Sequence, residues 1–327
     1  MLTGPGQIEL RDVDEPTAGS GETLVRIRAV GICGTDLSIF KGKIPVTYPR
    51  IMGHEMVGEV LVSPGGSPGP GTRVIVDPNV ACRRCDRCRE GRANLCAAGW
   101  LLGRDRDGAL CERVVAPAEN LYRVPEDLQD HLVPLIQVLT TCVHGQRLVP
   151  IFPGDGTVVV GLGVTGLLHV QLAKLRGADP VVGITRSPRA LELASELGAD
   201  VTIAADDPAV EDRVKEATGG GGDVVIEAAG TVATLGRAVR VARSGGRVLA
   251  YGTISERGGD FPYYDLYYKE LVLSSPRAAQ AEDYPVAIGA IASGSVRLDP
   301  LISRRVGLVG LSKTLDDPVG LKTIVEL

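Results

Sequence analysis

Residues 157–178, TVVVGLGVTGLLHVQLAKLRGA, place a glycine loop between a Val-rich run and an apolar helical stretch. Gly161, Gly163 and Gly166 form the pattern G-x-G-x-x-G, in the strand–turn–helix setting of a dinucleotide-binding βαβ unit. The first glycine permits a tight turn, the second lets a pyrophosphate approach the backbone, and the third lets helix and strand pack closely. Val164 opens the helix, whose N-terminus offers free N–H groups to phosphates. The alternative is a glycine-rich turn without a ligand.

The segments around this loop predict two structural classes. From about residue 156 onward, strand-like and helical stretches alternate, which indicates right-handed βαβ units on a parallel sheet. Between residue 8 and about residue 76, short β-branched runs are separated by Gly and Pro clusters, which is typical of a β-rich domain. We therefore expect an α/β protein with a Rossmann doubly wound parallel sheet and a β-rich domain. The length of 327 residues suffices for about two domains.

The composition excludes several function classes. A net charge of −5 argues against a nucleic-acid-binding protein, because such proteins are usually basic. The first residues, MLTGPGQIEL, lack the basic start and apolar core of a signal peptide, and glycines interrupt the longest apolar stretch. We therefore expect a cytoplasmic chain without a membrane span. In such a chain the seven cysteines favour metal ligands over disulfides.

The segment CRRCDRCREGRANLC predicts a structural metal site. Cys82, Cys85, Cys88 and Cys96 have the spacing C-x2-C-x2-C-x7-C, and four thiolates close a tetrahedral zinc shell without an open position for substrate. One alternative is a nucleic-acid zinc knuckle, suggested by the arginines between the cysteines. Another is an iron–sulfur cluster, for which the rest of the chain offers no electron-transfer context. We expect the arginines to form a solvated face that lowers the thiol pKa values.

Two isolated residues suggest a second metal site. Cys33 lies in GICGTD and His54 in GHE, each after a strand-like run. A thiolate, an imidazole and one further side chain leave an open position on zinc, which catalysis requires. Taken alone, a cysteine such as Cys33 is more often a buried small residue, and a histidine such as His54 is more often a hydrogen-bonded polar residue.

Together, GICGTD, GHE, the four-cysteine segment and G-x-G-x-x-G resemble the zinc-dependent medium-chain dehydrogenases/reductases, and the resemblance covers essentially the whole chain. It implies reversible hydride transfer between NAD(P) and a secondary alcohol, polyol, sugar or amino alcohol, or the matching ketone. It also implies a cytoplasmic homo-oligomer, a tetramer or a dimer, without nucleic-acid or membrane partners. The implied domains are a GroES-like catalytic domain with the zinc lobe (1–145), a Rossmann cofactor domain (146–275) and a return to the catalytic domain (276–327).

The resemblance also assigns roles to single residues. It implies that Cys33 and His54 ligate a catalytic zinc, and that Glu55 is the acidic neighbour that ligates this zinc or exchanges with water. Asp36 is the implied carboxylate that orients the ligand histidine. Thr35 is the implied hydroxyl that takes the substrate proton. The four clustered cysteines are the implied ligands of a structural zinc.

Two positions depart from the family pattern. Relatives often carry a further Cys or Glu zinc ligand before the cofactor domain, where PLIQVLTTCVHG in this chain offers Gln137. A neutral amide oxygen is a weaker zinc donor than a carboxylate. We predict that Gln137 lies in or next to the ligand shell of the catalytic zinc, whereas Cys142 and His144 look like helix residues. Ser38 stands where many relatives have the histidine of the proton relay.

The end of the second Rossmann strand bears on the choice of cofactor. In NAD enzymes this strand ends in Asp or Glu, which binds the adenosine ribose hydroxyls. Here VVGIT ends at Thr185, which does not repel a 2′-phosphate, and Arg186 and Arg189 follow. An arginine after the acid is also common in NAD enzymes, so the missing acid is the stronger argument. We predict a preference for NADP(H) over NAD(H).

Two other functions remain open from the sequence. A zinc-free enone or quinone reductase of the same superfamily would keep the glycine loop but lack the Cys33/His54 pair and the four-cysteine segment. A non-catalytic cofactor-binding protein on the same scaffold would bind the nicotinamide cofactor without zinc-dependent turnover. The sequence does not specify the substrate.

Overall fold

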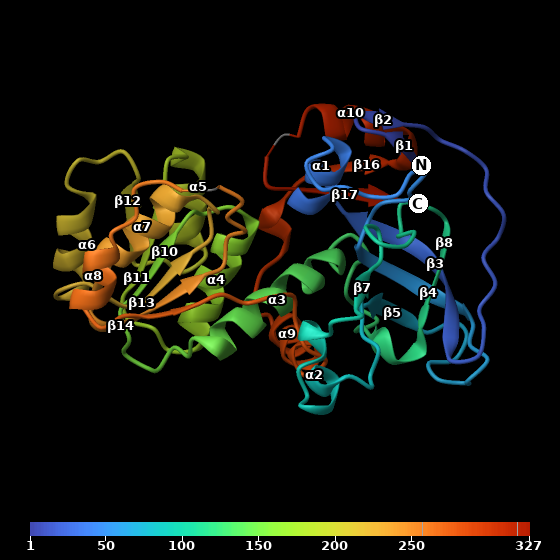
Figure 1. Ribbon diagram of the computed structural model, residues 1–327, viewed down its shortest axis with the longest axis horizontal. Helices are drawn as coiled ribbons and strands as arrows, with labels where there is room; N and C mark the ends of the chain where they lie inside the picture. Colours follow the sequence, from blue (N-terminus) through green and yellow to red (C-terminus); the bar gives the residue numbers. More distant parts are fainter. Residues whose placement is uncertain (257, 319) are drawn as a thin grey trace. The chain divides into compact units, whose positions relative to one another are not determined.

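The computed structural model describes residues 1–256, 258–318 and 320–327, and the chain forms two compact units (Figure 1). After the first unit the chain builds the second, and two later segments belong to the first unit again. Unit 1 comprises Met1–Thr140, Gln280–Ala292 and Leu298–Leu327, and unit 2 comprises Thr141–Ala279 and Ser293–Arg297.

Unit 1 is built on a mostly antiparallel sheet centred on β3 (Glu22–Gly31) and β4 (Glu55–Val62). The other strands of this sheet are β5 (Arg73–Val76), β8 (Arg113–Pro117), β9 (Leu121–Arg123), β16 (Ile302–Gly307) and β17 (Lys322–Glu326). The strand order is β16–β17–β3–β4–β5–β9, with β8 also paired to β3. Val25 and Ile27 enter the hydrophobic core in alternation, and Val30 enters it beyond a register shift between Ile27 and Ala29. Because β17 pairs directly with β3, the last segment of the chain completes this sheet.

Shorter elements surround this sheet. The strands are β1 (Leu2–Gly4), β2 (Gln7–Ile8), β6 (Asn79–Val80) and β7 (Trp100–Leu101). The α-helices are α1 (Gly34–Phe40), α2 (Asp86–Arg89), α3 (Pro134–Leu148), α9 (Asp283–Ala292) and α10 (Leu311–Asp316), and the 3-10 helices are η1 (Ala93–Leu95), η2 (Ala118–Asn120), η3 (Asp299–Leu301) and η4 (Leu308–Gly310). Helix α3 crosses the boundary between the units and contains Cys142 and His144, which confirms that they are helix residues.

Unit 2 contains a parallel sheet of the order β12–β11–β10–β13–β14–β15. The strands are β10 (Thr157–Val160), β11 (Val181–Thr185), β12 (Val201–Ala204), β13 (Gly222–Glu227), β14 (Ala242–Ala250) and β15 (Val272–Ser274). The helices are α4 (Val164–Leu175), α5 (Pro188–Glu196), α6 (Val210–Thr218), α7 (Val232–Val241) and α8 (Tyr263–Tyr268). Helix α4 packs beside α5, and α6 beside α7. This strand order is that of a Rossmann sheet, so the predicted fold class is confirmed.

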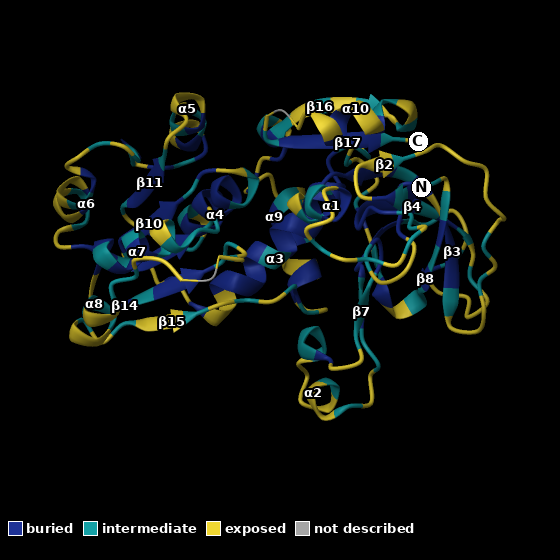
Figure 2. Ribbon diagram, turned by 45° about the horizontal axis from the view of Figure 1, so that its top comes forward, coloured by how far each residue is buried: buried dark blue, intermediate teal, exposed yellow. Residues whose placement is uncertain are grey.

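The strands of unit 2 are largely buried, because parallel strands carry helices on both faces (Figure 2). Valines and isoleucines at positions such as Val158, Val182 and Val225 form the core of this unit. No helix within the described residues is both long and apolar enough to cross a membrane.

Candidate metal and cofactor sites

The four clustered cysteines come together in a small lobe around α2 and η1. The Sγ atoms of Cys82, Cys85, Cys88 and Cys96 all lie within 4.8 Å of one another. Cys85 Sγ is 3.5 Å from Cys88 Sγ and 3.8 Å from Cys96 Sγ. Tetrahedral zinc with Zn–S bonds of roughly 2.3 Å places its sulfurs roughly 3.8 Å apart, so this donor set fits one zinc ion.

The thiols of this lobe differ in their pKa values. The backbone N–H groups of Arg84 and Cys85 lower the pKa of Cys82 to about 6, whereas burial and the neighbouring thiols raise the pKa of Cys88 to about 12. Four adjacent thiolates therefore need a cation to form together. The lowering comes from backbone N–H groups, which corrects the expectation that the arginines cause it. As predicted, the arginines form an exposed, solvated face: Arg83, Arg84, Arg87, Arg89 and Arg92.

A second donor set forms where β3 and β4 meet. Strand β4 begins at Glu55, which pairs with Gly31 at the end of β3, and Cys33 follows as the N-cap of α1. The ligand atoms of Cys33, His54 and Glu55 lie within 4.8 Å of one another. Cys33 is half-buried, whereas His54 and Glu55 are buried. A thiolate, an imidazole and a carboxylate suit zinc and, as three donors, leave one tetrahedral position open.

Asp36 contacts two residues of this second donor set, Cys33 and His54. Its carboxylate accepts hydrogen bonds from the backbone N–H groups of Cys33 (2.9 Å) and Gly53 (3.2 Å), and its Oδ1 lies 3.4 Å from Nδ1 of His54. Burial disfavours charge on both partners, yet their mutual attraction leaves the pKa of Asp36 lowered and that of His54 raised well above its usual value. Asp36 therefore contacts His54 on its Nδ1 side, and the orienting role that the resemblance implies for Asp36 stays a prediction. Thr35 is half-buried in the first turn of α1, two residues after Cys33.

Glu55 has a partner that the sequence analysis did not find. Lys322, the first residue of β17, donates from Nζ to both oxygens of Glu55, at 3.0 and 2.8 Å, and to the carbonyl oxygen of Ile32 at 3.2 Å. Burial lowers the pKa of Lys322, but the negative charges of Glu55, Cys33 and Asp36 together offset this, and the pKa is raised. A single lysine near the end of a strand carries no local signal of this role, because the contact depends on the β3–β17 pairing.

Gln137 lies on α3 and is buried. Its Oε1 accepts a hydrogen bond from the hydroxyl of Tyr284, whose ring stacks on Tyr122 with the centroids 4.1 Å apart. Asp77 contacts the same Tyr284, and burial raises the pKa of Asp77 to about 6. Gln137 therefore belongs to a buried polar network, and its approach to the catalytic zinc stays a prediction.

The glycine loop has the form that a dinucleotide needs. Gly161 has a φ of +94°, and a Cβ there would lie 2.8 Å from the backbone nitrogen of Ala229. A Cβ on Gly166 would lie 1.9 Å from the carbonyl oxygen of Gly161, so the close helix–strand packing requires glycine. A Cβ on Gly163 would meet no atom within 4 Å. This open side, at the N-terminus of α4 where Val164 begins the helix, is where a pyrophosphate fits.

The end of β11 presents the residues predicted to meet the adenosine ribose. Thr185 ends the strand and is half-buried, while Arg186 and Arg189 are exposed. Ser187 caps α5 by accepting a hydrogen bond from the backbone N–H of Ala190 at 3.4 Å. Neither arginine forms an ion pair with any residue that the structure describes. Both guanidinium groups are thus available to an anion.

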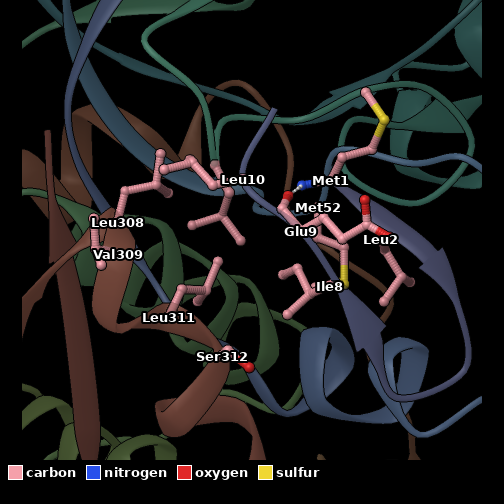
Figure 3. A pocket seen from close by; sticks show the side chains of 11 residues that line it. Met1, Leu2, Ile8, Glu9, Leu10, Met52, Leu308, Val309, Leu311 and Ser312 are labelled. Atoms are coloured by element: carbon pink, nitrogen blue, oxygen red, sulfur yellow. Dashed lines mark hydrogen bonds between the residues drawn. The ribbon is translucent and has the colours of Figure 1, made fainter. Parts of the chain in front are cut away.

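Unit 1 also contains a small apolar cavity of about 110 Å³ near the first residues of the chain (Figure 3). Leu2, Ile8, Met52 and Leu311 are among the residues that line it, and the amine of Met1 donates to the carbonyl oxygen of Glu9 at 2.7 Å. Met52 lies two residues before His54, but none of the predicted site residues lines this cavity.

Comparisons with known proteins agree with this geometry. Residues 19–126 match the family described as "Alcohol dehydrogenase GroES-like domain", and residues 164–293 match "Zinc-binding dehydrogenase". The chain is 32% identical to L-threonine 3-dehydrogenase of Pyrococcus horikoshii over 93% of this chain and 90% of that protein.

Two solved structures share the fold of the whole chain. One is a protein of Sinorhizobium meliloti 1021 named as a zinc-binding dehydrogenase and crystallised with NADP, with 34% identity, a TM-score of 0.92, and coverage of 100% of this chain and 98% of the other. Alcohol dehydrogenase TADH of Thermus sp. ATN1 has 30% identity and a TM-score of 0.92, with coverage of 99% and 98%. The chain therefore belongs to the zinc-dependent medium-chain dehydrogenases/reductases and is an NAD(P)-dependent zinc alcohol dehydrogenase.

Proposed function

We propose that Cys33, His54 and Glu55 form the catalytic zinc site, and that the four clustered cysteines hold a second, structural zinc in each chain. The observation that carries this division is the contrast between a closed four-thiolate set and an open set of three different donors. When bound at the open set, zinc supplies Lewis-acid polarisation of an alcohol or carbonyl oxygen. The substrate is a secondary alcohol, polyol, sugar or amino alcohol, or the matching ketone.

The residues of the chain supply orientation and proton transfer. Asp36 fixes the ring of His54, since its carboxylate also binds the backbone on both sides of the site. Thr35 takes the proton of the substrate hydroxyl, because it lies two residues from Cys33 at the start of α1. Gln137 lies in or next to the zinc shell from α3, with its amide held by Tyr284. A nicotinamide cofactor bound by the glycine loop would supply or accept the hydride of this reaction.

The cofactor is NADP(H) in preference to NAD(H). Gly161, Gly163, Val164 and Gly166 bind the pyrophosphate at the N-terminus of α4. Thr185, Arg186 and Arg189 receive the 2′-phosphate, and this is supported by the absence of an acid at the end of β11 and by the two available guanidinium groups.

The functional domains are a catalytic domain (1–145), a cofactor domain (146–275) and a C-terminal return to the catalytic domain (276–327). The enzyme works in the cytoplasm, which is supported by its seven free cysteines, because disulfides are rare where thiols are kept reduced.

The enzyme is a homo-oligomer, a dimer or a tetramer. Support comes from α8, where Tyr263, Tyr264, Tyr267 and Tyr268 are each about 70% exposed or more, and from the adjacent β15 (Figure 2). Strand β15 is the edge of the parallel sheet, and its Val272 and Leu273 are exposed. An uncharged, apolar edge strand pairs readily with a second copy of itself about a two-fold axis.

The function is tested by measuring NAD(P)H absorbance with a panel of sugars, polyols, amino alcohols and simple secondary alcohols. We expect turnover with at least one class, its loss on prolonged chelation and its recovery on adding Zn²⁺. Turnover that survives complete metal removal would favour a zinc-free reductase. Cofactor binding without turnover on any substrate, in protein that holds two zinc ions per chain, would favour a non-catalytic role.

A further inference from the structure

Lys322 is the buried cation of the candidate catalytic site. Only 5% of the residue is exposed, and its ammonium group has three acceptors: both oxygens of Glu55 and the carbonyl oxygen of Ile32. These three acceptors match the three N–H donors of a lysine. The ammonium is therefore fully satisfied and fixed in one position.

The pairing of β17 with β3 brings Lys322 next to Glu55. Strand β17 pairs with β3, and the backbone N–H of Ile32 donates to the carbonyl oxygen of Thr323 at 3.0 Å, so Lys322 lies beside the end of β3. Gly31 pairs with Glu55 across β3 and β4, and a Cβ at residue 31 would lie 2.3 Å from Glu55 Oε2. Glycine thus leaves the room in which the carboxylate turns toward the lysine.

The same carboxylate belongs to the zinc-ligating set. A carboxylate oxygen of Glu55 lies within 4.8 Å of the ligand atoms of Cys33 and His54. A metal ion bound there and the Lys322 ammonium would therefore both contact the Glu55 carboxylate. Each carboxylate oxygen has a limited number of lone pairs, and a paired positive charge weakens its attraction for a second cation. The charge of Glu55 is therefore divided between two partners.

We propose that Lys322 is a positioning residue that competes with the catalytic metal for Glu55 and so keeps this carboxylate a weak, exchangeable ligand. Lys322 leaves Cys33 and His54 as the firm ligands and preserves a position for the substrate. This inference rests on the proposed function of the Cys33, His54 and Glu55 set.

The test uses the full chain with Zn²⁺ as the probe. Two variants, Lys322→Met and Lys322→Arg, are prepared with and without metal. The matched control is Lys174→Met, which removes a surface ion pair with Asp200 in unit 2. In Lys322→Met we expect a lower melting temperature of the metal-free protein, because Glu55 is left unpaired. We also expect a larger rise in melting temperature on adding Zn²⁺ than in wild type.

A second readout is the release of zinc to a chelator. The zinc that Cys33→Ser lacks should leave Lys322→Met at least about five times more slowly than wild type, a difference of about 1 kcal/mol. Lys322→Arg and Lys174→Met should release it at the wild-type rate. Lys322→Gln, which keeps hydrogen-bond donors without the charge, replaces Lys322→Met should that variant not fold, with the same slower release expected.

Two results distinguish failure of the Lys322 inference from failure of the proposed catalytic site. In the first, the melting temperature of Lys322→Met falls by the same amount with and without Zn²⁺, and this variant releases zinc at the wild-type rate. That result shows a structural role only and overturns the inference. Wild type that holds no more zinc than Cys33→Ser overturns the proposed catalytic site itself.

Discussion

The side-chain oxygen of Gln137 accepts a hydrogen bond from the hydroxyl of Tyr284, which lies 147 residues later in the chain. Both side chains are buried, and Tyr284 is further fixed by stacking on Tyr122. The amide of Gln137 is thus oriented by an element, α9, that follows the long segment Thr141–Ala279 of unit 2. This relationship makes Tyr284 a determinant of the orientation of the Gln137 amide.

The first prediction concerns Gln137 itself. Gln137→Glu should be tolerated and should tighten the binding of the catalytic zinc, because a carboxylate is a stronger donor than an amide. Gln137→Leu should weaken zinc binding by roughly tenfold or more. Tyr284→Phe, which keeps the ring stacking but removes the hydroxyl, should show a smaller loss. The measurement is zinc affinity by chelator competition. Equal affinity in wild type and all three variants would show that Gln137 is not part of the metal site.

The two metal sites should respond differently to the loss of a ligand. Cys33→Ser should reduce kcat/KM by at least about a hundredfold with little change in melting temperature, because an open site contributes mainly to the reaction. Cys85→Ser should mainly lower stability, by several kcal/mol as an order of magnitude, because a closed site contributes directly to folding. Metal content, thermal unfolding and turnover are measured on both. Similar losses of stability in the two variants would contradict this division.

The cofactor preference should depend on the end of β11. Thr185→Asp should shift the ratio of kcat/KM for NADP(H) over NAD(H) toward NAD(H) by at least about tenfold, or about 1.4 kcal/mol, because an acid there repels a 2′-phosphate. Arg186→Ala should lower kcat/KM for NADP(H) more than for NAD(H). A wild type that clearly prefers NAD(H), or a Thr185→Asp variant without a shift, would show that this strand end does not distinguish the cofactors.

Asp77 should make stability depend on pH. Burial raises its pKa from 3.8 to about 6 in the folded protein, so the native state binds more protons than the unfolded state between these values. Stability then falls as the pH rises through about 6. Asp77→Asn removes this titration and should gain about 1.4 kcal/mol relative to wild type between pH 5 and pH 7.5. Urea unfolding of both proteins at the two pH values measures the gain, and parallel pH profiles would refute it.

The exposed edge of unit 2 should control assembly. Val272→Lys places a charge on β15 and should convert the oligomer into smaller species, because charged edge strands resist pairing. Val62→Lys, at a similarly exposed position on β4, serves as the control and should keep the wild-type mass. Analytical ultracentrifugation reads the outcome, and an unchanged mass of Val272→Lys would place the interface elsewhere.

Local patterns predicted much of unit 2. The spacing of Gly161, Gly163 and Gly166 requires a strand, a turn and a helix in succession, and β10 and α4 follow this requirement. The four cysteines are close in sequence, so their lobe was also predictable. Cys33 and His54, in contrast, are brought together by the pairing of β3 with β4, so their residue types could only suggest a metal site and the family resemblance supplied their roles.

Long-range contacts account for what the sequence did not reveal. Lys322 and Tyr284 act through partners on distant elements, and neither lies in a recognisable motif. The assignment of residues 293–297 to unit 2 has a similar origin. Gln171 on α4 donates to the carbonyl oxygen of Arg297 at 3.1 Å and accepts from its backbone N–H at 2.7 Å, across 126 residues. The periodicity of hydrophobic residues cannot predict such hydrogen bonds between a side chain and a distant backbone.

The ion pair between Glu55 and Lys322 spans 267 residues, and it therefore has a consequence for the order of synthesis. On the ribosome, strands β3 and β4 emerge long before β17, and unit 2 is made in between. Throughout that interval the Glu55 carboxylate lacks its Lys322 partner, and one side of β3 lacks its neighbouring strand. A nascent chain that stalls before residue 322 therefore keeps an open strand edge on β3, and an open edge is a template for pairing with another chain.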